Sequence, residues 1–417
     1  MAYGMQPMPL AARNPLQAGR GMVGKPAVGG GAPGLPERDT ATLDLDFTKG
    51  FLDPRLTFTR ASAGSQMGAR GLIESVPTDK PRFNHDPVTG KCLGLLVEEQ
   101  RTNVCLYSQD ISNVAWNTTS DTSYATDSAV APDGTTTADT LTATSSNGLR
   151  QQDVTTTAIA WNFSVYLLRK TGTGDVQITM DGTTFVTQTI NSTTWTSCTV
   201  LQTGVAGTSK PGIRLVTSGD EVYVWGAQAE AGNFPSSYIP TTSASAVRYG
   251  DLVVMIGTKR KYLSWFNPLG GTLFVDVMFV NATNTGLNEK IVTIGDGTFS
   301  TNTINIEHCT STIGYIRGLA SSVAWSGAYS ASIEFFSPVV AGTWYRAVYS
   351  MVGRFRTGAV NGTRLAGGIF LYAPLLIAKK LNIGSAGNDA VFMNGTIARV
   401  IYRPFGKTAQ QCRRMTL

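Results

Sequence analysis

The chain has few charged residues and no long hydrophobic run. Asp, Glu, Lys and Arg make up 15% of its 417 residues, against roughly 25% in an average soluble domain. No apolar run approaches the ~18 residues needed to cross a bilayer. The N-terminus also lacks the charged-then-apolar pattern of a signal peptide. We therefore expect neither membrane insertion nor signal-directed secretion.

Side chains suited to metal binding and nucleophilic catalysis are also scarce. Only His85 and His308 are present. Two histidines leave almost no residues from which a Ser-His-Asp triad or a His-rich metal site could be built. We expect both histidines at the surface or in turns. The cysteines are odd in number, widely spaced and without a C-x-x-C pair, which predicts buried free thiols and no cofactor: Cys92, Cys105, Cys198, Cys309 and Cys412.

No catalytic constellation and no strong basic patch stand out. Glu98 and Glu99 are adjacent, so on a strand they point in different directions and do not form the carboxylate pair that glycan cleavage needs. The net charge of +6 is mild, and the longest basic block is residues 259–261. We expect a protein that is not an enzyme and binds no nucleic acid. A polysaccharide depolymerase remains an alternative.

Glycine, aromatic residues and short alternating segments are abundant. The chain has 45 glycines, 17 phenylalanines and 14 tyrosines, and no helix longer than a turn or two is evident. Short strands separated by turns are typical of sandwiches and jelly rolls. The predicted fold class is all-β, with two β-sandwich or jelly-roll domains preceded by an extended N-terminal arm.

We divide the sequence into four parts. Residues 1–39 are rich in Pro and Gly and predict an extended arm that needs an external surface to order it. Residues 40–104 predict a β collar or linker, in which Asp44 and Asp46 share a solvent face. Residues 105–251 predict a jelly-roll sandwich that closes with the stretch 221–251, in which Trp225 is expected in the core. Residues 252–417 predict a second sandwich.

The second sandwich carries the clearest local signals. Asn361-Gly362 between two apolar alternating runs predicts a tight hairpin, and the polar residues 408–414 predict one or two helical turns. Residues 314–340 look poorly periodic and rich in turns. Three aromatic residues of this region, Trp325, Tyr329 and Tyr315, are the candidate sugar platform, because a sugar face is apolar and its rim is hydroxylated. The alternative is that these rings cap the core of the sandwich or a subunit interface.

Two resemblances follow from these motifs. The runs LDFTKGFLDPRLTFTRAS, FNHDPVTGKCLGLLVEEQRTNVCLYSQDISNVAW and WGAQAEAGNFPSSYIPTTSASAVRYGD resemble a recurrent module of bacteriophage virion appendage proteins, over about residues 41–251. That resemblance implies a jelly roll similar to carbohydrate-binding modules. The runs WYRAVYS, AVNGT and FMNGTIARV look like core strands and turns of concanavalin-type lectins.

The resemblance implies a structural subunit of a tailed phage virion, assembled in the bacterial cytoplasm. A tail fibre or spike that contributes to attachment to a host surface polysaccharide is the expected function, and a head-decorating fibre or minor capsid protein is an alternative. A homotrimer is implied. The arm is expected to bind another virion protein (a tail adaptor, nozzle, portal or capsid protein) through residues that include Asn14, Pro15, Arg20, Lys25 and Pro26.

Overall fold

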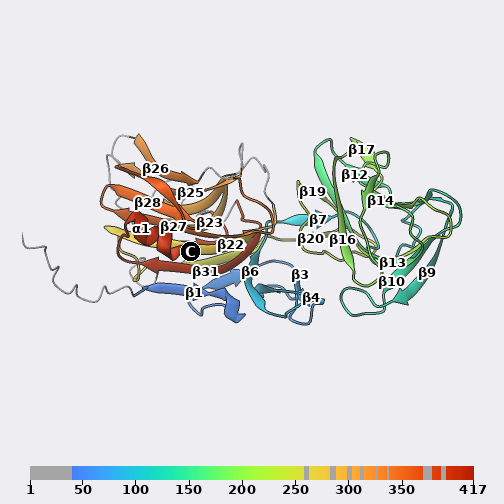
Figure 1. Ribbon diagram of the computed structural model, residues 1–417, viewed down its shortest axis with the longest axis horizontal. Helices are drawn as coiled ribbons and strands as arrows, with labels where there is room; N and C mark the ends of the chain where they lie inside the picture. Colours follow the sequence, from blue (N-terminus) through green and yellow to red (C-terminus); the bar gives the residue numbers. More distant parts are fainter. Residues whose placement is uncertain are drawn as a thin grey trace, which may run out of the picture. The chain divides into compact units, whose positions relative to one another are not determined.

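A computed structural model shows that the protein is built almost entirely from antiparallel β-sheets (Figure 1), which confirms the all-β class. The structure describes residues 40–257, 263–281, 288–297, 303–309, 314–324, 327–335, 338–369, 378–386 and 391–417. Thr40–Leu417 form one compact unit. The predicted arm, with its five candidate anchoring residues, lies outside the described residues.

One sandwich, here called the C-terminal sandwich, has an eight-stranded sheet. Its strands follow the order β29-β28-β27-β22-β31-β6-β5, and β1 also pairs with β31. Their bounds are Thr363–Ile369 (β29), Phe355–Val360 (β28), Trp344–Val352 (β27), Gly270–Phe279 (β22), Gly395–Arg403 (β31), Cys92–Val97 (β6), Arg82–His85 (β5) and Leu43–Asp46 (β1).

The facing sheet of the C-terminal sandwich has seven strands in the order β2-β21-β30-β23-β24-β25-β26. Their bounds are Thr57–Thr59 (β2), Leu252–Ile256 (β21), Lys380–Ile383 (β30), Asn288–Gly295 (β23), Thr303–Cys309 (β24), Tyr315–Ala324 (β25) and Gly327–Phe335 (β26). β25 and β26 pair over most of their length. Residues 314–340 therefore contain two paired strands where the sequence predicted a turn-rich region, because backbone pairing holds these Ser-, Ala- and Gly-rich segments without an apolar alternation.

Alternation along β22 separates the core from the outer face of the eight-stranded sheet. Val275, Val277 and Phe279 are fully buried in the core between the two sheets. Phe274 faces the other way and is covered by the single described helix, α1 (Ala409–Met415), through Cys412. Thr408 caps this helix, and its side chain accepts a hydrogen bond from the backbone of Gln411. The predicted helical turns are confirmed.

A second sandwich is inserted into the first. The chain leaves through β7 (Arg101–Asn103) and returns through β20 (Ala246–Arg248), and these two strands pair with each other. Between them, the order β16-β13-β19-β10-β9 forms one five-stranded sheet and β15-β14-β18-β11-β8 the other. Their fully buried core includes Phe163, Ile178 and Val222. We call this unit the inserted sandwich.

The two five-stranded sheets of the inserted sandwich are formed by strands between Thr118 and Ala231. Their bounds are Thr196–Thr203 (β16), Ala160–Thr171 (β13), Glu221–Ala231 (β19), Ala138–Ala143 (β10), Thr122–Ala129 (β9), Val186–Gln188 (β15), Val176–Thr179 (β14), Gly212–Leu215 (β18), Gly148–Gln151 (β11) and Thr118–Ser120 (β8). The smaller pairs are β12 (Val154–Thr156) with β17 (Gly207–Ser209), and β3 (Gly64–Met67) with β4 (Ile73–Val76).

Four strands from residues 40–104, the region predicted as a β collar or linker, belong to the sheets of the C-terminal sandwich. β1, β5 and β6 lie in its eight-stranded sheet and β2 lies in its seven-stranded sheet. Leu43, Leu45 and Phe47 are buried in the same core as Val400 and Ile294. Alternation identifies a strand, but it does not reveal that the partner strand lies about 350 residues further along the chain.

The predicted hairpin at Asn361-Gly362 is confirmed. It joins β28 to β29, and both turn residues have positive φ, 43° and 74°. Two residues with positive φ make the turn that best matches the twist of paired strands, and Gly adopts this conformation without steric cost.

Replacing Gly362 with alanine is expected to lower the free energy of unfolding by about 1–2 kcal/mol, because an L-residue is strained at this φ. The added Cβ also meets Leu417 Cδ2 at 2.7 Å. Urea unfolding measures the change. The exposed neighbour Thr363→Ala is the control, and equal stability of the two variants would contradict the strain argument.

Candidate functional site

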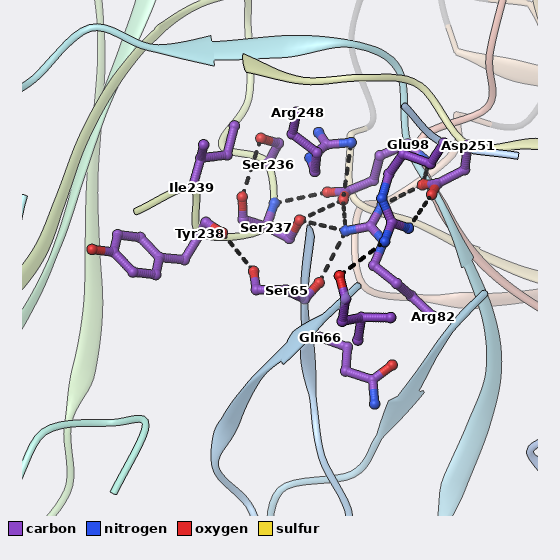
Figure 2. Close-up of polar contacts among 12 residues, drawn as sticks. Ser65, Gln66, Arg82, Glu98, Ser236, Ser237, Tyr238, Ile239, Arg248 and Asp251 are labelled. Carbon is purple, nitrogen blue, oxygen red and sulfur yellow. Dashed lines mark hydrogen bonds and ion pairs between the residues drawn. The ribbon is translucent and has the colours of Figure 1, made fainter. Parts of the chain in front are cut away.

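Charged side chains from segments that are far apart in the sequence meet in a buried group (Figure 2). The group, here called the motif cluster, consists of Arg60, Arg82, Glu98, Arg248 and Asp251. Their side chains are 0–3% exposed. Arg82 is on β5, Glu98 follows β6, Arg248 ends β20 and Asp251 precedes β21. The cluster lies where the chain passes between the two sandwiches.

Arg82 is the centre of the motif cluster. Its Nη2 pairs with Asp251 Oδ2, and its Nη1 lies 2.6 Å from Glu98 Oε2. Nη1 also donates to the carbonyl of Ser65 at 2.9 Å and to Ser237 Oγ at 2.6 Å. One guanidinium therefore connects the C-terminal sandwich, the β3–β4 hairpin and the loop that closes the inserted sandwich.

Each carboxylate of the cluster is shared between partners. Asp251 accepts from Arg60 Nη1 at 2.9 Å and from the backbone N–H of Glu98 at 3.0 Å. Glu98 accepts from the backbone N–H and hydroxyl of Ser237 at 2.8 and 2.6 Å. Burial by itself raises the pKa of Glu98, but the positive charges of Arg248 and Arg82 and the bonds from Ser237 outweigh it and lower the pKa to about 2.

The side chains of the motif cluster are buried and pair with one another, which indicates a structural role. The same holds for Trp225, which is 1% exposed and packs at 4.5 Å from the Tyr238 ring centroid. Its Nε1 donates to Thr137 Oγ1. The prediction that Trp225 lies in the core is confirmed. Residues 221–251 thus complete the inserted sandwich and connect it to the C-terminal sandwich.

A groove of about 540 Å³ lies beside α1 on the outer face of the eight-stranded sheet. Neighbouring strands β27, β22, β31 and β6 supply its floor, and the 3-10 turn η1 (Phe47–Lys49) and the end of the α1 segment supply its walls. It is lined by Thr48, Lys91, Cys92, Leu93, Asp276, Trp344, Arg346, Asn361, Ala398, Thr416 and Leu417. We call it the Trp344 groove.

Register and hairpin geometry position the polar groups of the groove. Asp276 and Arg346 are direct cross-strand partners, with Asp276 Oδ2 3.3 Å from Arg346 Nε. Asn361 Oδ1 accepts from the backbone N–H of Arg346 at 2.8 Å, and its Nδ2 donates to the carbonyl of Trp344 at 3.2 Å. The Asn-Gly turn therefore fixes the strand that carries both the indole and the guanidinium.

The groove combines an aromatic ring with hydrogen-bonding groups that carry positive and negative charge. Trp344 is half-buried, Asp276 is 21% exposed and Arg346 is 48% exposed. Burial raises the pKa of Asp276, and the charge of Arg346 opposes that rise. Lys91 and Thr48 are exposed at the rim. An apolar ring face beside carboxylate, guanidinium, ammonium and hydroxyl groups suits a ligand with an apolar face and a hydroxylated edge.

The three sugar-platform candidates are not brought together by the described structure. Trp325 lies outside the described residues, and Tyr329 is described only as a backbone position in β26. Tyr315 is half-buried on β25 opposite Cys309, on the sheet face that carries Arg317 and Glu307. The sequence analysis missed Trp344 because WYRAVYS was interpreted as a core strand. Only its position at the strand end, two residues before an outward-facing Arg, signalled a different role.

The two histidines differ in how deeply they are buried. His85 is half-buried on β5 and its Nδ1 lies 3.2 Å from the carbonyl of Met67. His308 is fully buried on β24, with Nδ1 3.0 Å from Glu289 Oε2 and its ring beside Phe279. The expected surface or turn location is therefore wrong for His308. The core strand β24 can hold His308 because the buried carboxylate of Glu289 pairs with its ring.

Other sequence expectations can be compared directly. None of the five cysteines is in a disulfide; four are buried and Cys92 is half-buried. Asp44 is exposed and Asp46 half-buried on the same face of β1. Within the described ranges, no three His, Cys, Asp or Glu side chains are grouped to hold a metal ion. In the same part of the chain, no helix is long and apolar enough to cross a membrane.

Comparisons with known proteins find only distant structural likenesses. No protein-family model matches the chain, and no curated protein matches it. The chain is similar to the CBM40 of the Ruminococcus gnavus IT-sialidase bound to α2,3-sialyllactose, with 13% identity, a TM-score of 0.30, and coverage of 38% of this chain and 85% of that one.

Two further solved structures are also similar to part of the chain. A heptameric SAP-like pentraxin from Limulus polyphemus has 11% identity and a TM-score of 0.28, with 36% of this chain and 70% of that one covered. The Trypanosoma rangeli sialidase has 17% identity and a TM-score of 0.29, with 40% and 26% covered. These likenesses carry no argument about ligand or activity. The β-sandwich description rests on the sheets themselves.

Proposed function

We propose that the protein is a structural subunit of a tailed bacteriophage particle, a tail fibre or spike, and that the Trp344 groove binds a glycan of the host surface. The observation that carries the binding proposal is the half-buried indole of Trp344 beside Asp276, Arg346 and Lys91 in a preformed groove. The phage assignment is supported by the resemblance of residues 41–251 to virion appendage modules.

The composition of the groove favours a sugar over a purely apolar ligand. Arg346 Nη1 already donates to the carbonyl of Leu417 at 2.7 Å, and Asp276 holds its Nε. These bonds orient both charged groups before a ligand arrives, so little side-chain entropy is lost on binding. A volume of about 540 Å³ is within the range of small-molecule sites, which is roughly 300–1,000 Å³.

Replacing Trp344 with alanine is expected to weaken glycan binding about tenfold or more, because it removes the ring on which a sugar face stacks. Trp344→Phe keeps an aromatic face and should lose less. The measurement is a glycan array that includes polysaccharide from candidate bacterial hosts, followed by titration of any ligand that binds.

The matched control is Tyr124→Ala, which removes a ring that is 47% exposed on the inserted sandwich. It should leave binding unchanged. Thermal unfolding of each variant confirms that the sandwich remains folded. Equal binding by wild type and Trp344→Ala would remove this groove from the attachment site.

The proposed assembly gives residues 1–39 the role of a virion anchor in a homotrimer. Deleting them is expected to abolish incorporation of the protein into particles, while the compact unit Thr40–Leu417 still folds and binds glycan. Immunoblotting of purified particles, with the unassembled pool as the control, measures this. Incorporation of the truncated protein at the wild-type level would overturn the anchoring role.

A further inference from the structure

A second cavity, of about 350 Å³, is lined by residues from both sandwiches. The ends of β13 and β19 in the inserted sandwich, β23 in the C-terminal sandwich and the residues around β7 supply its walls. A volume of this size is within the range of small-molecule sites, and such sites are common between domains. We call it the junction cavity, and its walls include Glu99, Arg101, Ile159, Glu289, Val391 and Phe392.

The positive charge of Arg101 is already paired within the protein. Its side chain is 6% exposed, and its Nη2 lies 2.5 Å from Glu99 Oε1. Its Nη1 donates to the carbonyl of Ala231, and the guanidinium lies over the Phe234 ring, 4.6 Å from the ring centroid. Glu99 is 33% exposed, so its second oxygen, Oε2, remains accessible. Together, Glu99 and Arg101 contribute no net charge to the cavity.

Glu289 adds a buried carboxylate to the wall of the junction cavity. Its side chain is 2% exposed. Its Oε1 accepts hydrogen bonds from Asn281 Nδ2 at 3.0 Å and from Asn394 Nδ2 at 3.3 Å, and its Oε2 lies 3.0 Å from His308 Nδ1. Both carboxyl oxygens act as acceptors, which suits the ionised form. The two amides satisfy hydrogen bonds of this carboxylate but bring no charge.

Neither His308 nor Lys290 neutralises Glu289. His308 Nε2 is buried and has no hydrogen-bond partner among the described residues. A protonated ring would leave a charged N–H donor unpaired at that atom, which is costly in a protein interior, so the neutral ring with its proton on Nδ1 fits this site. Lys290 directs its Nζ to Glu307 instead. In the described part of the chain, the junction cavity therefore has one uncompensated negative charge.

We propose that the junction cavity binds a small organic cation, a protonated amine carried on an apolar body. The ammonium group lies between the carboxylate of Glu289 and Glu99 Oε2, and the apolar body contacts Ile159, Val391 and Phe392. A cation that enters this site compensates a buried charge and forms charge-assisted hydrogen bonds, which are stronger than neutral ones. The site is separate from the Trp344 groove and does not depend on the glycan proposal.

Calorimetric titration of the full chain tests the proposal with two probes of similar shape, benzylamine and benzyl alcohol. The wild-type protein should bind benzylamine at least about tenfold more tightly than benzyl alcohol, because hydrogen bonds between charged groups are the stronger ones. Glu289→Gln should lose about tenfold in affinity for benzylamine and little for the alcohol. Glu99→Gln changes a partly exposed side chain and should lose several-fold for benzylamine.

Glu74→Gln is the matched control, because Glu74 is 35% exposed and also pairs with an arginine, Arg70. It should bind benzylamine as the wild type does. Thermal unfolding shows whether Glu289→Gln is folded, and Glu99→Gln decides the question if it is not. Failure of the wild type to bind benzylamine, or equal affinity for the two probes, would overturn the proposal. Benzylamine binding that the folded glutamine variants leave unchanged would also overturn it.

Discussion

Replacing Arg82 with methionine is expected to lower the free energy of unfolding by about 3–5 kcal/mol. Arg82 is fully buried and pairs with both Asp251 and Glu98. Removing one member of a buried ion network leaves the remaining charges desolvated and uncompensated, which costs far more than the net value of the pairs. The variant also loses the bonds to Ser65 and Ser237 that hold the inserted sandwich to the other one.

Urea unfolding measures this change, and Arg55→Met is the matched control. Arg55 pairs with Asp53 at 2.7 Å, but its side chain is 47% exposed, so the substitution should cost at most ~1 kcal/mol. Proteolysis between the two sandwiches should also become faster in Arg82→Met. A loss near that of Arg55→Met would show that the motif cluster does not join the sandwiches.

Acid is expected to destabilise the protein through Glu98. The pKa of this carboxyl is lowered from 4.5 to about 2 in the folded protein. A lowered folded pKa means that the contribution is fully present above the unfolded value and is lost as pH falls from about 4.5 toward about 2. The loss is on the order of 3 kcal/mol for a shift of this size.

Unfolding free energies of wild type and Glu98→Gln across this pH range isolate the effect. The difference between the two proteins should shrink as pH falls, because glutamine carries no charge to lose. Asp139 works in the opposite direction: burial raises its pKa from 3.8 to about 6, so its contribution is lost as pH rises through that range. Because wild type and Glu98→Gln both contain Asp139, its contribution cancels in the difference between their unfolding free energies. A difference independent of pH would contradict the shifted carboxyl.

Local patterns in the sequence identified most elements of the fold. Short strands separated by turns predicted the all-β class, which the observed antiparallel sheets confirm. Asn361-Gly362 predicted the hairpin, because two positive φ values suit those residues. The polar residues 408–414 predicted one or two helical turns, and α1 lies there.

Non-local pairing was not accessible from the sequence. The pairing of β1 with β31 and the insertion of one sandwich into the other depend on strands that are far apart in the sequence. His308 was misplaced because its partner, Glu289, lies on a neighbouring strand. The Trp344 groove combines η1, β6, β22, β27, β31 and the residues after α1, and no local pattern places these side chains together.

A crystal structure with a glycan selected on the array tests the central claim most directly. The account predicts density for the sugar over the Trp344 indole, with its hydroxyls within hydrogen-bonding distance of Asp276, Arg346 or Lys91. Sugar density elsewhere, for example beside Tyr315 on the seven-stranded sheet, with the Trp344 groove empty, would contradict it.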